Sequence, residues 1–341
     1  MEKDMEFAKN ENINRIMVTG GGGYVGSSLV PMLLDYGYQV SVLDTFWYGK
    51  GVFGAYNNHQ NLTLVEGDLR NEADVKLALV DCDAVIHLAC ISNDPSFDLQ
   101  PDLGRSINFD CFEPLVKIAK SNGVKRFIYA SSSSVYGVKD TPNVIETDSM
   151  EPLTDYSIFK AKCEKILEKY KGDGFVTTTL RPATVCGYST RQRLDVVVNI
   201  LTNLAYNKGE ITVFGGTQLR PNIHILDMCR IYLLVLASDD EKIDGEIFNA
   251  GYENHSVSEL AEMVKDVIGP DVKIITQPSD DNRSYHVSSD KIMNVLGFKP
   301  SKTIKNAIED LVENFKAGNL PDSLNSAEYF NIKKMQELNI T

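Results

Sequence analysis

The stretch Ile16-Met-Val-Thr-Gly-Gly-Gly-Gly-Tyr-Val-Gly26 decides the fold of this chain. Three apolar residues lead through Thr19 into four glycines, and residues 24–36 then repeat apolar side chains at helical spacing. This pattern predicts a strand, a tight turn and the N-terminus of a helix in immediate succession. Because the free N–H groups and the dipole of a helix N-terminus favour negative charge, we expect the turn to bind a phosphate.

The glycines fit two spacings of a phosphate-binding turn, either Gly20, Gly23 and Gly26 or Gly21, Gly23 and Gly26. A glycine-rich stretch alone is equally consistent with a flexible loop, but a second strand follows at 38–44 and ends in Asp44. A carboxylate there is placed to accept hydrogen bonds from the adenosine ribose of a dinucleotide. Since it also repels the 2′-phosphate of NADP, the sequence predicts NAD as the cofactor.

Composition limits the class of protein. The 341 residues are 43% hydrophobic and 24% charged, which indicates a globular chain of one large domain or two closely joined ones. A net charge of −13 argues against a general nucleic-acid or anionic-membrane surface. No segment is apolar enough to span a membrane, and the polar first residues do not resemble a secretory signal. We therefore expect a cytoplasmic protein that binds neither membrane nor nucleic acid.

The six cysteines are scattered, without a CxxC pair or a Cys/His cluster. This spacing favours reduced thiols over disulfides and predicts no metal site.

Strand and helix patterns alternate through the first half of the chain, which predicts a parallel sheet built from βαβ units. Strands are expected at 38–44, 62–66, 84–88, 125–130 and 175–181, and helices at 71–80, 99–122 and 155–171, with a loop at 45–60. After Pro182 the alternation breaks, with helices expected at 195–208, 225–236, 257–267 and 303–317 and strands at 210–214, 247–251 and 272–276. These later pieces suit a smaller α/β lobe over the carboxyl edge of the sheet, where open α/β folds bind ligands.

A second pattern, Tyr156-Ser-Ile-Phe-Lys160, opens the helix expected at 155–171. Residues four apart share a helix face, so the tyrosine hydroxyl and the lysine ammonium can act on one site. A free tyrosine has a pKa of about 10, and a nearby ammonium favours its phenolate. The spacing is also common on ordinary surface helices, and its position downstream of the glycine turn is what favours a catalytic pair.

Taken together, these segments resemble the extended short-chain dehydrogenases/reductases of the NAD-dependent nucleotide-sugar epimerase/dehydratase family, over roughly residues 14–320. The matching stretches are 19–26, Asp44, 67–69, 87–89, 130–137, 156–160, 181–182 and 220–227. The resemblance implies a Rossmann-type doubly wound parallel sheet with a smaller α/β substrate-binding lobe. It implies an NAD-binding domain at 14–185 and about 225–256, a lobe at 186–224 and 257–330, and a loose N-terminal extension at 1–13.

The resemblance also assigns residues to the cofactor. Tyr156 would be the catalytic base, Lys160 its electrostatic partner, and Ser132 the hydroxyl that bonds the oxidised sugar position. Asp68 would accept from the adenine amine. The implied cofactor-binding residues are Gly20, Gly23, Tyr24, Val25, Gly26, Asp44, Asp68, Leu69, Leu88, Ala89, Cys90, Ala130, Tyr156, Lys160 and Arg181.

The serine run Ser131-Ser-Ser-Ser134 bears on the reaction. In sugar 4,6-dehydratases of this family an Asp and a Glu typically follow the position of Ser132, whereas this chain has Ser133 and Ser134. Hydroxyls cannot perform general acid–base chemistry near neutral pH, so dehydration is disfavoured and decarboxylation somewhat less so. Ser133 and Ser134 either contact the substrate or pack at the strand end.

The substrate diphosphate needs cations. Arg220 and Arg283 match two family arginines near the nucleotide diphosphate, although Pro221-Asn222 replaces the acid that usually follows the first. Arg191 and Arg193 flank Gln192 and are further candidates. The expected substrate-binding residues are Ser133, Ser134, Asn199, Arg193, Arg220 and Arg283.

The sequence therefore predicts NAD-dependent oxidation at C4 of a nucleotide-diphosphate sugar, as a 4-epimerase serving carbohydrate and polysaccharide biosynthesis. The main alternative is a 4-dehydrogenase that releases a 4-keto sugar. A non-catalytic NAD-sensing regulator is disfavoured because the Ser132, Tyr156 and Lys160 set is intact. The resemblance further implies a homodimer or higher homo-oligomer.

Overall fold

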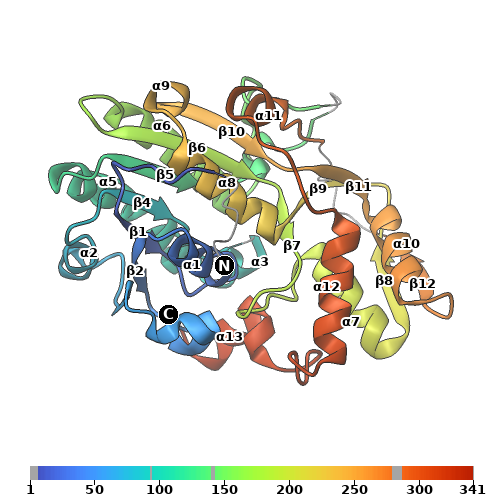
Figure 1. Cartoon of the computed structure of the whole chain (residues 1–341). Coiled ribbons are helices and arrows are strands. Elements are labelled where there is room, and N and C mark those ends of the chain that lie inside the picture. Colours follow the sequence, from blue (N-terminus) through green and yellow to red (C-terminus); the bar gives the residue numbers. More distant parts are fainter. Residues whose placement is uncertain (1–6, 93, 140–142, 279–285, 341) are drawn as a thin grey trace.

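The computed structural model describes residues 7–92, 94–139, 143–278 and 286–340. A seven-stranded sheet with all neighbours parallel runs through the larger domain in the order β10-β6-β5-β4-β1-β2-β3 (Figure 1). Its strands are β1 (Arg15–Thr19), β2 (Gln39–Asp44), β3 (Leu62–Glu66), β4 (Ala84–His87), β5 (Arg126–Ala130), β6 (Val176–Pro182) and β10 (Glu246–Ala250). This arrangement confirms the doubly wound parallel sheet.

Alternating side chains of the strands build two cores. In β1, Ile16 and Val18 point into the core shared with α1 and α8, whereas Met17 points into the core shared with α2, α5 and α6. Because helices cover both faces of this parallel sheet, its central strands β1, β4 and β5 are mostly apolar and buried. The covering helices are α1 (Gly26–Asp35) and α8 (Ile225–Ala237) on one face, and α2 (Glu72–Ala78), α5 (Phe112–Ser121) and α6 (Asp155–Leu167) on the other.

The smaller lobe has its own core, formed by three helices and a two-stranded parallel sheet. These elements are α7 (Val197–Lys208), α10 (Val257–Ile268), α12 (Ile304–Lys316), β8 (Glu210–Phe214) and β12 (Lys273–Gln277). Between the lobe and the domain lies a three-stranded sheet that the sequence patterns did not predict. It is formed by β7 (Thr184–Cys186), β9 (Leu219–His224) and β11 (Glu253–Ser256).

Two predicted segments differ from the structure. The long helix expected at 99–122 is divided, because Pro101 takes the first position of a new helix, where its missing N–H costs no hydrogen bond. The divided pieces are α3 (Asp94–Leu99), α4 (Pro101–Arg105), the π-helix η2 (Ser106–Asp110) and α5. The loop expected at 45–60 contains the 3₁₀ helix η1 (Lys50–Asn58), and further short helices are η3 (Ser133–Tyr136), η4 (Glu168–Tyr170), α9 (Asp240–Ile243) and η5 (Ala327–Tyr329).

The predicted domain boundaries also need correction at both ends. Residues 1–6 of the expected loose extension lie outside the described residues, but Ile13 is buried and the Lys9 ammonium lies 5.0 Å from the centre of the Tyr38 ring. The helix α11 (Asp290–Leu296), assigned to the lobe, packs on β10 and places Ile292 in the core of the larger domain. A last helix, α13 (Asn331–Glu337), follows the expected end of the lobe.

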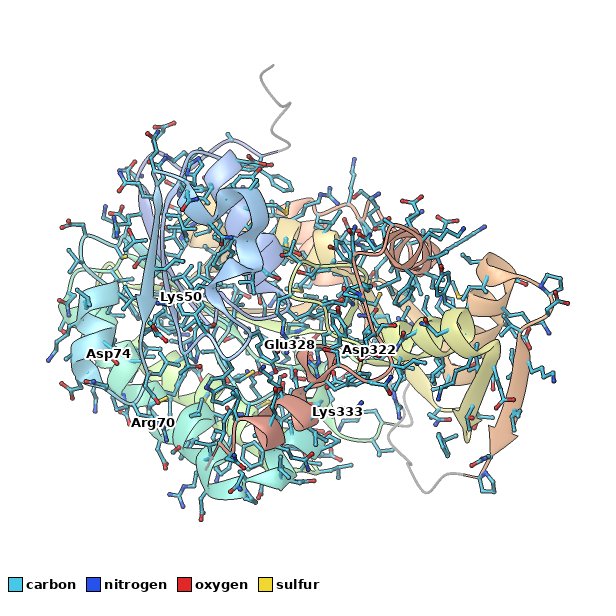
Figure 2. The ribbon with its side chains drawn as sticks, turned by 90° about the horizontal axis from the view of Figure 1, so that it is seen from below. Lys50, Arg70, Asp74, Asp322, Glu328 and Lys333 are labelled. Carbon is cyan, nitrogen blue, oxygen red and sulfur yellow. The ribbon has the colours of Figure 1, made fainter. Side chains whose placement is uncertain are left out.

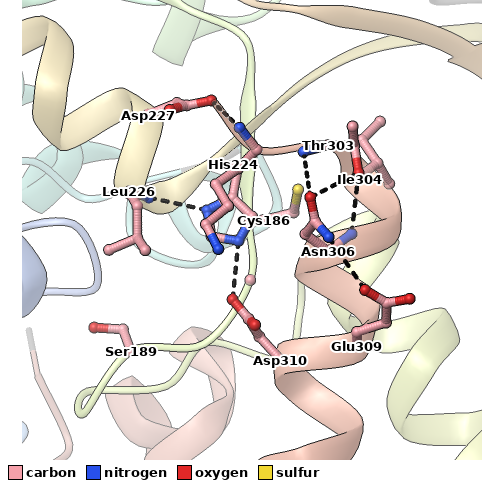
Figure 3. Close-up of polar contacts among 12 residues, drawn as sticks. Cys186, Ser189, His224, Leu226, Asp227, Thr303, Ile304, Asn306, Glu309 and Asp310 are labelled. Atoms are coloured by element: carbon pink, nitrogen blue, oxygen red, sulfur yellow. Dashed lines mark hydrogen bonds and ion pairs between the residues drawn. The ribbon is translucent and has the colours of Figure 1, made fainter. Parts of the chain in front are cut away.

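His224 and Asp227 join the two parts of the molecule at the start of α8 (Figure 3). The His224 side chain caps α8 by accepting from the Leu226 N–H at 3.1 Å, and its Nε2 lies 3.0 Å from Asp310 of α12. The buried Asp227 accepts from the backbone N–H groups of Ser301 and Lys302, which lead into α12. The lobe is thereby anchored to the helix that follows β9.

Among the described residues, no helix combines the length and the apolar character needed to cross a membrane.

Candidate active site at the carboxyl end of the sheet

A cavity of about 510 Å³ lies at the carboxyl ends of β1, β2, β4 and β5, below residues of the smaller lobe. This is the edge at which open parallel sheets bind ligands. All the predicted cofactor residues except Arg181 line it, as do the three predicted catalytic residues.

The glycine turn admits no side chains at two positions. Gly20 has φ +68°, and a Cβ there would lie 2.5 Å from the Ala89 Cα. A Cβ on Gly26 would collide with the backbone of Gly21. The Gly23 N–H donates to the Gly20 carbonyl at 3.1 Å, and α1 begins at Gly26. The turn therefore brings bare backbone and a helix N-terminus to the cavity, as a dinucleotide pyrophosphate requires.

Asp44 ends β2 beside this turn. Its carboxylate accepts from the N–H groups of Gly22 at 2.9 Å and Phe46 at 2.7 Å. Burial raises the pKa of Asp44, while these two N–H groups and the charge of Arg191 oppose the rise. The two backbone bonds fix the carboxylate at the wall of the cavity, in the position predicted for contact with an adenosine ribose.

Replacing Asp44 with asparagine should weaken the preference for NAD over NADP. The asparagine amide keeps an oxygen for one backbone N–H but lacks the charge that repels a 2′-phosphate. Because like charges at close range cost several kcal/mol, we expect the ratio of the two dissociation constants to narrow by roughly tenfold or more. Titration of both cofactors measures it, with Asp266→Asn as a charge-matched control in the distant α10. An unchanged ratio would show that Asp44 does not select the cofactor.

Tyr156 and Lys160 lie in the first turns of α6, which Thr154 caps by accepting from the Ser157 N–H at 3.3 Å. The buried Lys160 ammonium donates to the Ala130 carbonyl at 2.7 Å and lies 5.8 Å from the centre of the Tyr156 ring. The Tyr156 hydroxyl is hydrogen-bonded to Ser132. The three predicted catalytic residues thus meet at one wall of the cavity.

Burial raises the pKa of the Tyr156 hydroxyl above its usual value, and the neighbouring Cys90 adds to this rise. The charge of Arg193 and the hydrogen bond from Ser132 act in the opposite direction. Lys160, whose ammonium was expected to favour the phenolate, donates instead to the Ala130 carbonyl and is not among the main causes of this shift in pKa. In the protein alone Tyr156 is a protonated phenol at neutral pH.

Two arginines of the 187–195 loop bring positive charge to the cavity. The Arg191 guanidinium stacks 3.5 Å from the centre of the Tyr48 ring, and Arg193 pairs with Asp195 at 2.5 Å. Arg191 Nε and Arg193 Nη2 are buried yet have no hydrogen-bond partner among the described residues. Buried donors normally find acceptors, so these two N–H groups are suited to the oxygen atoms of a bound anion.

Two residues that were predicted to bind the cofactor or the substrate bond other parts of the protein instead. Arg181 is 2% exposed and forms a buried ion pair with Glu164 at 2.7 Å, behind the cavity wall. Asn199 is fully buried and bonds the backbone of Gly187 and the Tyr24 hydroxyl, so it braces the loop and does not face the cavity. In both cases the polar groups are already used within the protein.

The other predicted substrate-binding residues either line the cavity or lie outside the described residues. Ser133, Ser134, Arg193 and Arg220 line the cavity, whereas Arg283 lies outside the described residues. The cavity is also lined by residues that the sequence analysis did not assign to the site, among them Tyr48, Asp195, Asn331 and Met335. Tyr48 follows Asp44 in an aromatic-rich loop, which is a usable signal, but Asn331 and Met335 come from α13 and belong to no motif.

Comparison with known proteins agrees with this geometry. The model of the NAD dependent epimerase/dehydratase family matches residues 16–251, well over half of the chain. The chain is 27% identical over 314 residues to a UDP-glucose 4-epimerase of Corynebacterium glutamicum, covering 87% of this chain and 94% of that protein.

Two solved structures are also similar. The first is a UDP-N-acetylglucosamine 4-epimerase from Methanobrevibacter ruminantium, with TM-score 0.81, 26% identity and coverage of 90% and 99% of the two chains. The second is a UDP-glucuronic acid 4-epimerase from Bacillus cereus in complex with UDP-glucuronic acid and NAD, with TM-score 0.80, 26% identity and coverage of 89% and 99%.

The chain belongs to the NAD-dependent epimerase/dehydratase family. It is an NAD-dependent enzyme of the extended short-chain dehydrogenase/reductase kind, related to nucleotide-sugar epimerases and dehydratases. Its own residues fit the cofactor, since the glycine turn, the fixed Asp44 carboxylate and the unpaired arginine donors surround one cavity.

Proposed function

We propose that this enzyme inverts C4 of a nucleotide-diphosphate sugar, as a 4-epimerase. The observation that carries the proposal is the meeting of Ser132, Tyr156 and Lys160 in the cavity that also contains the glycine turn. Bound NAD supplies the acceptor for the C4 hydride and the donor that returns it. Since the relatives named above act on UDP sugars, UDP-hexoses are the substrates to test first.

The side chains supply the proton chemistry. The Ser132 hydroxyl holds the C4 hydroxyl of the sugar beside Tyr156, whose phenolate oxygen takes the hydroxyl proton as C4 loses its hydride. Tyr156 then returns the same proton when the hydride comes back to the opposite face of C4. The positive charge of Arg193 favours the deprotonated form of this oxygen, and the Lys160 ammonium lies 5.8 Å from the centre of the Tyr156 ring.

The serine run supports epimerisation over dehydration. A dehydratase needs carboxyl groups to remove and donate the protons that accompany loss of water, and this chain has Ser133 and Ser134 at those positions. Two carboxylates elsewhere in the cavity are already engaged, Asp94 with Thr154 at 2.6 Å and Asp195 with Arg193. The cavity therefore favours simple oxidation and reduction at one carbon.

A panel of UDP-, dTDP-, GDP- and CDP-hexoses tests the proposal. With an epimerase, C4 is inverted and the absorbance at 340 nm shows no net NADH. Accumulation of NADH with a 4-keto product would instead establish the 4-dehydrogenase, which uses the same residues. A 6-deoxy-4-keto product would contradict the inference from Ser133 and Ser134, and loss of carbon dioxide from a uronic acid would identify a decarboxylase.

Replacing Arg193 with methionine should move the ascending limb of the pH–rate profile to higher pH. The active form of Tyr156 is deprotonated, and the positive charge of Arg193 lowers its pKa. Removing that charge raises the pKa, so a smaller fraction of the enzyme is active at neutral pH. Arg193→Lys, which keeps the charge, is the matched control and should shift the limb less. Identical profiles for all three proteins would exclude this role.

A further inference from the structure

We propose that Asn331 of the C-terminal segment (residues 318–340) is a positioning residue that retains NAD in the cavity between turnovers. The inference rests on the NAD-dependent function, and it concerns release of the cofactor, which is separate from the choice between epimerase and dehydrogenase. Asn331 lies just beyond the predicted end of the lobe at residue 330, and the whole segment lies outside the family match at 16–251.

Asn331 connects three parts of the cavity wall. Its Oδ1 accepts from the Tyr48 hydroxyl at 2.9 Å and from Arg191 Nη2 at 2.6 Å, and its Nδ2 donates to the Ser92 hydroxyl at 2.9 Å. Tyr48 follows β2, Ser92 follows β4, and Arg191 belongs to the loop that leads to the smaller lobe. The side chain is 93% buried by this arrangement, since the residue is 7% exposed. One amide thus holds three segments that are far apart in the sequence.

Its backbone reaches the catalytic end of the cavity. The Asn331 N–H donates to Asp195 at 2.9 Å, and Asp195 pairs with Arg193, the residue whose charge acts on Tyr156. Substitution of the side chain leaves this backbone bond in place. The side-chain and backbone contacts of Asn331 can therefore be tested separately.

The segment around Asn331 is itself anchored on both sides of the cavity. Ser323 exchanges hydrogen bonds with Asn203 of α7, and the Tyr329 carbonyl accepts from the Leu194 N–H at 2.8 Å. Met335 packs in a small core with Phe97 of α3. Figure 2 shows Asp322 and Glu328 of the segment lying between the larger domain and the smaller lobe. Such anchoring gives Asn331 a fixed position from which to hold its partners.

The proposed retention of NAD follows from the location of Tyr48 and Arg191, two partners of the Asn331 side chain. Tyr48 follows Asp44 by four residues, and both line the cavity together with Arg191, whose charge opposes the rise in the Asp44 pKa. The Arg191–Tyr48 stack therefore lies at the end of the cavity predicted for adenosine. A dinucleotide enclosed by this stack leaves faster when the stack moves freely. Retained cofactor suits an enzyme that returns each hydride to the sugar from which it came.

The test measures release of NAD directly. The full-length protein is loaded with radiolabelled NAD, excess unlabelled NAD is added, and the label that remains bound is counted after gel filtration at successive times. We expect Asn331→Ala to release the label at least about tenfold faster than the unmodified protein, equivalent to about 1.4 kcal/mol. Asn331→Asp keeps an acceptor for Tyr48 and Arg191 and should release it at nearly the original rate.

Asn325→Ala is the matched control, since Asn325 is exposed and its side chain donates to Asp322 of the same segment at 2.8 Å. Tyr48→Phe removes one bond to Asn331 and should accelerate release by less than Asn331→Ala, with no added effect in the double variant beyond that of Asn331→Ala. Thermal unfolding of every variant establishes that each is folded. Equal release rates for Asn331→Ala, Tyr48→Phe and the unmodified protein would overturn the proposal, whatever reaction the sugar panel reveals.

Discussion

Replacing Tyr156 with phenylalanine should lower turnover of the nucleotide sugar by about 10²–10⁴-fold, the range lost when a positioned general base is removed. The phenyl ring fills the same space but has no oxygen to take the C4 hydroxyl proton. NAD should still bind, because the glycine turn and Asp44 are unchanged. Steady-state rates and NAD titration measure the two effects, and Tyr252→Phe, at a position 43% exposed, is the control.

A Tyr156→Phe variant that turns over normally would show that another group removes the proton. A variant that has lost NAD affinity as well would show that the tyrosine acts mainly in binding. Only a large fall in kcat with retained cofactor agrees with Tyr156 as the base.

Replacing Glu164 with alanine should lower the free energy of unfolding by about 3–5 kcal/mol, because it leaves the buried Arg181 guanidinium without its counter-charge. Glu164 also accepts from Ser131, the neighbour of Ser132, so the serine run should lose a support as well. Chemical denaturation measures the loss. Glu72→Ala breaks an exposed pair with Lys76 and should have little effect.

The double variant Glu164→Met with Arg181→Met should recover much of the loss, because it removes the unpaired charge and keeps apolar volume. If Glu164→Ala were as mild as Glu72→Ala, the Arg181–Glu164 pair would not be a strong structural contact. That result would again favour the prediction that Arg181 binds the cofactor.

The main sheet was predictable because each of its strands has a local signature. Buried parallel strands such as β1 and β5 are short continuous apolar runs, and the glycine turn fixes how the first of them connects to a helix. The strands β7, β9 and β11 have no such signature. In β11, the residues from Glu253 to Ser256 are all polar and half-buried, so only pairing with β9 makes them a strand.

The residues of the candidate site also divide into those that a local motif predicts and those that only the fold reveals. Tyr156, Lys160 and Asp44 stand in local motifs, and the structure brings them to one cavity as the sequence predicted. The family resemblance predicted that Arg181 binds the cofactor. Its partner Glu164 lies on another element, so only the folded structure reveals the ion pair between them. Asn331 reaches Tyr48 and Ser92 across most of the chain, and no spacing of residues predicts such a contact.

Transfer of deuterium from C4 tests the central claim most directly. NAD-loaded enzyme is incubated with a nucleotide hexose labelled with deuterium at C4, and the product sugar is examined by mass spectrometry and NMR. A 4-epimerase that keeps its cofactor predicts inverted C4 with the deuterium still attached to it and no labelled NADH in solution. Release of deuterated NADH together with a 4-keto sugar would contradict this account and identify a dehydrogenase.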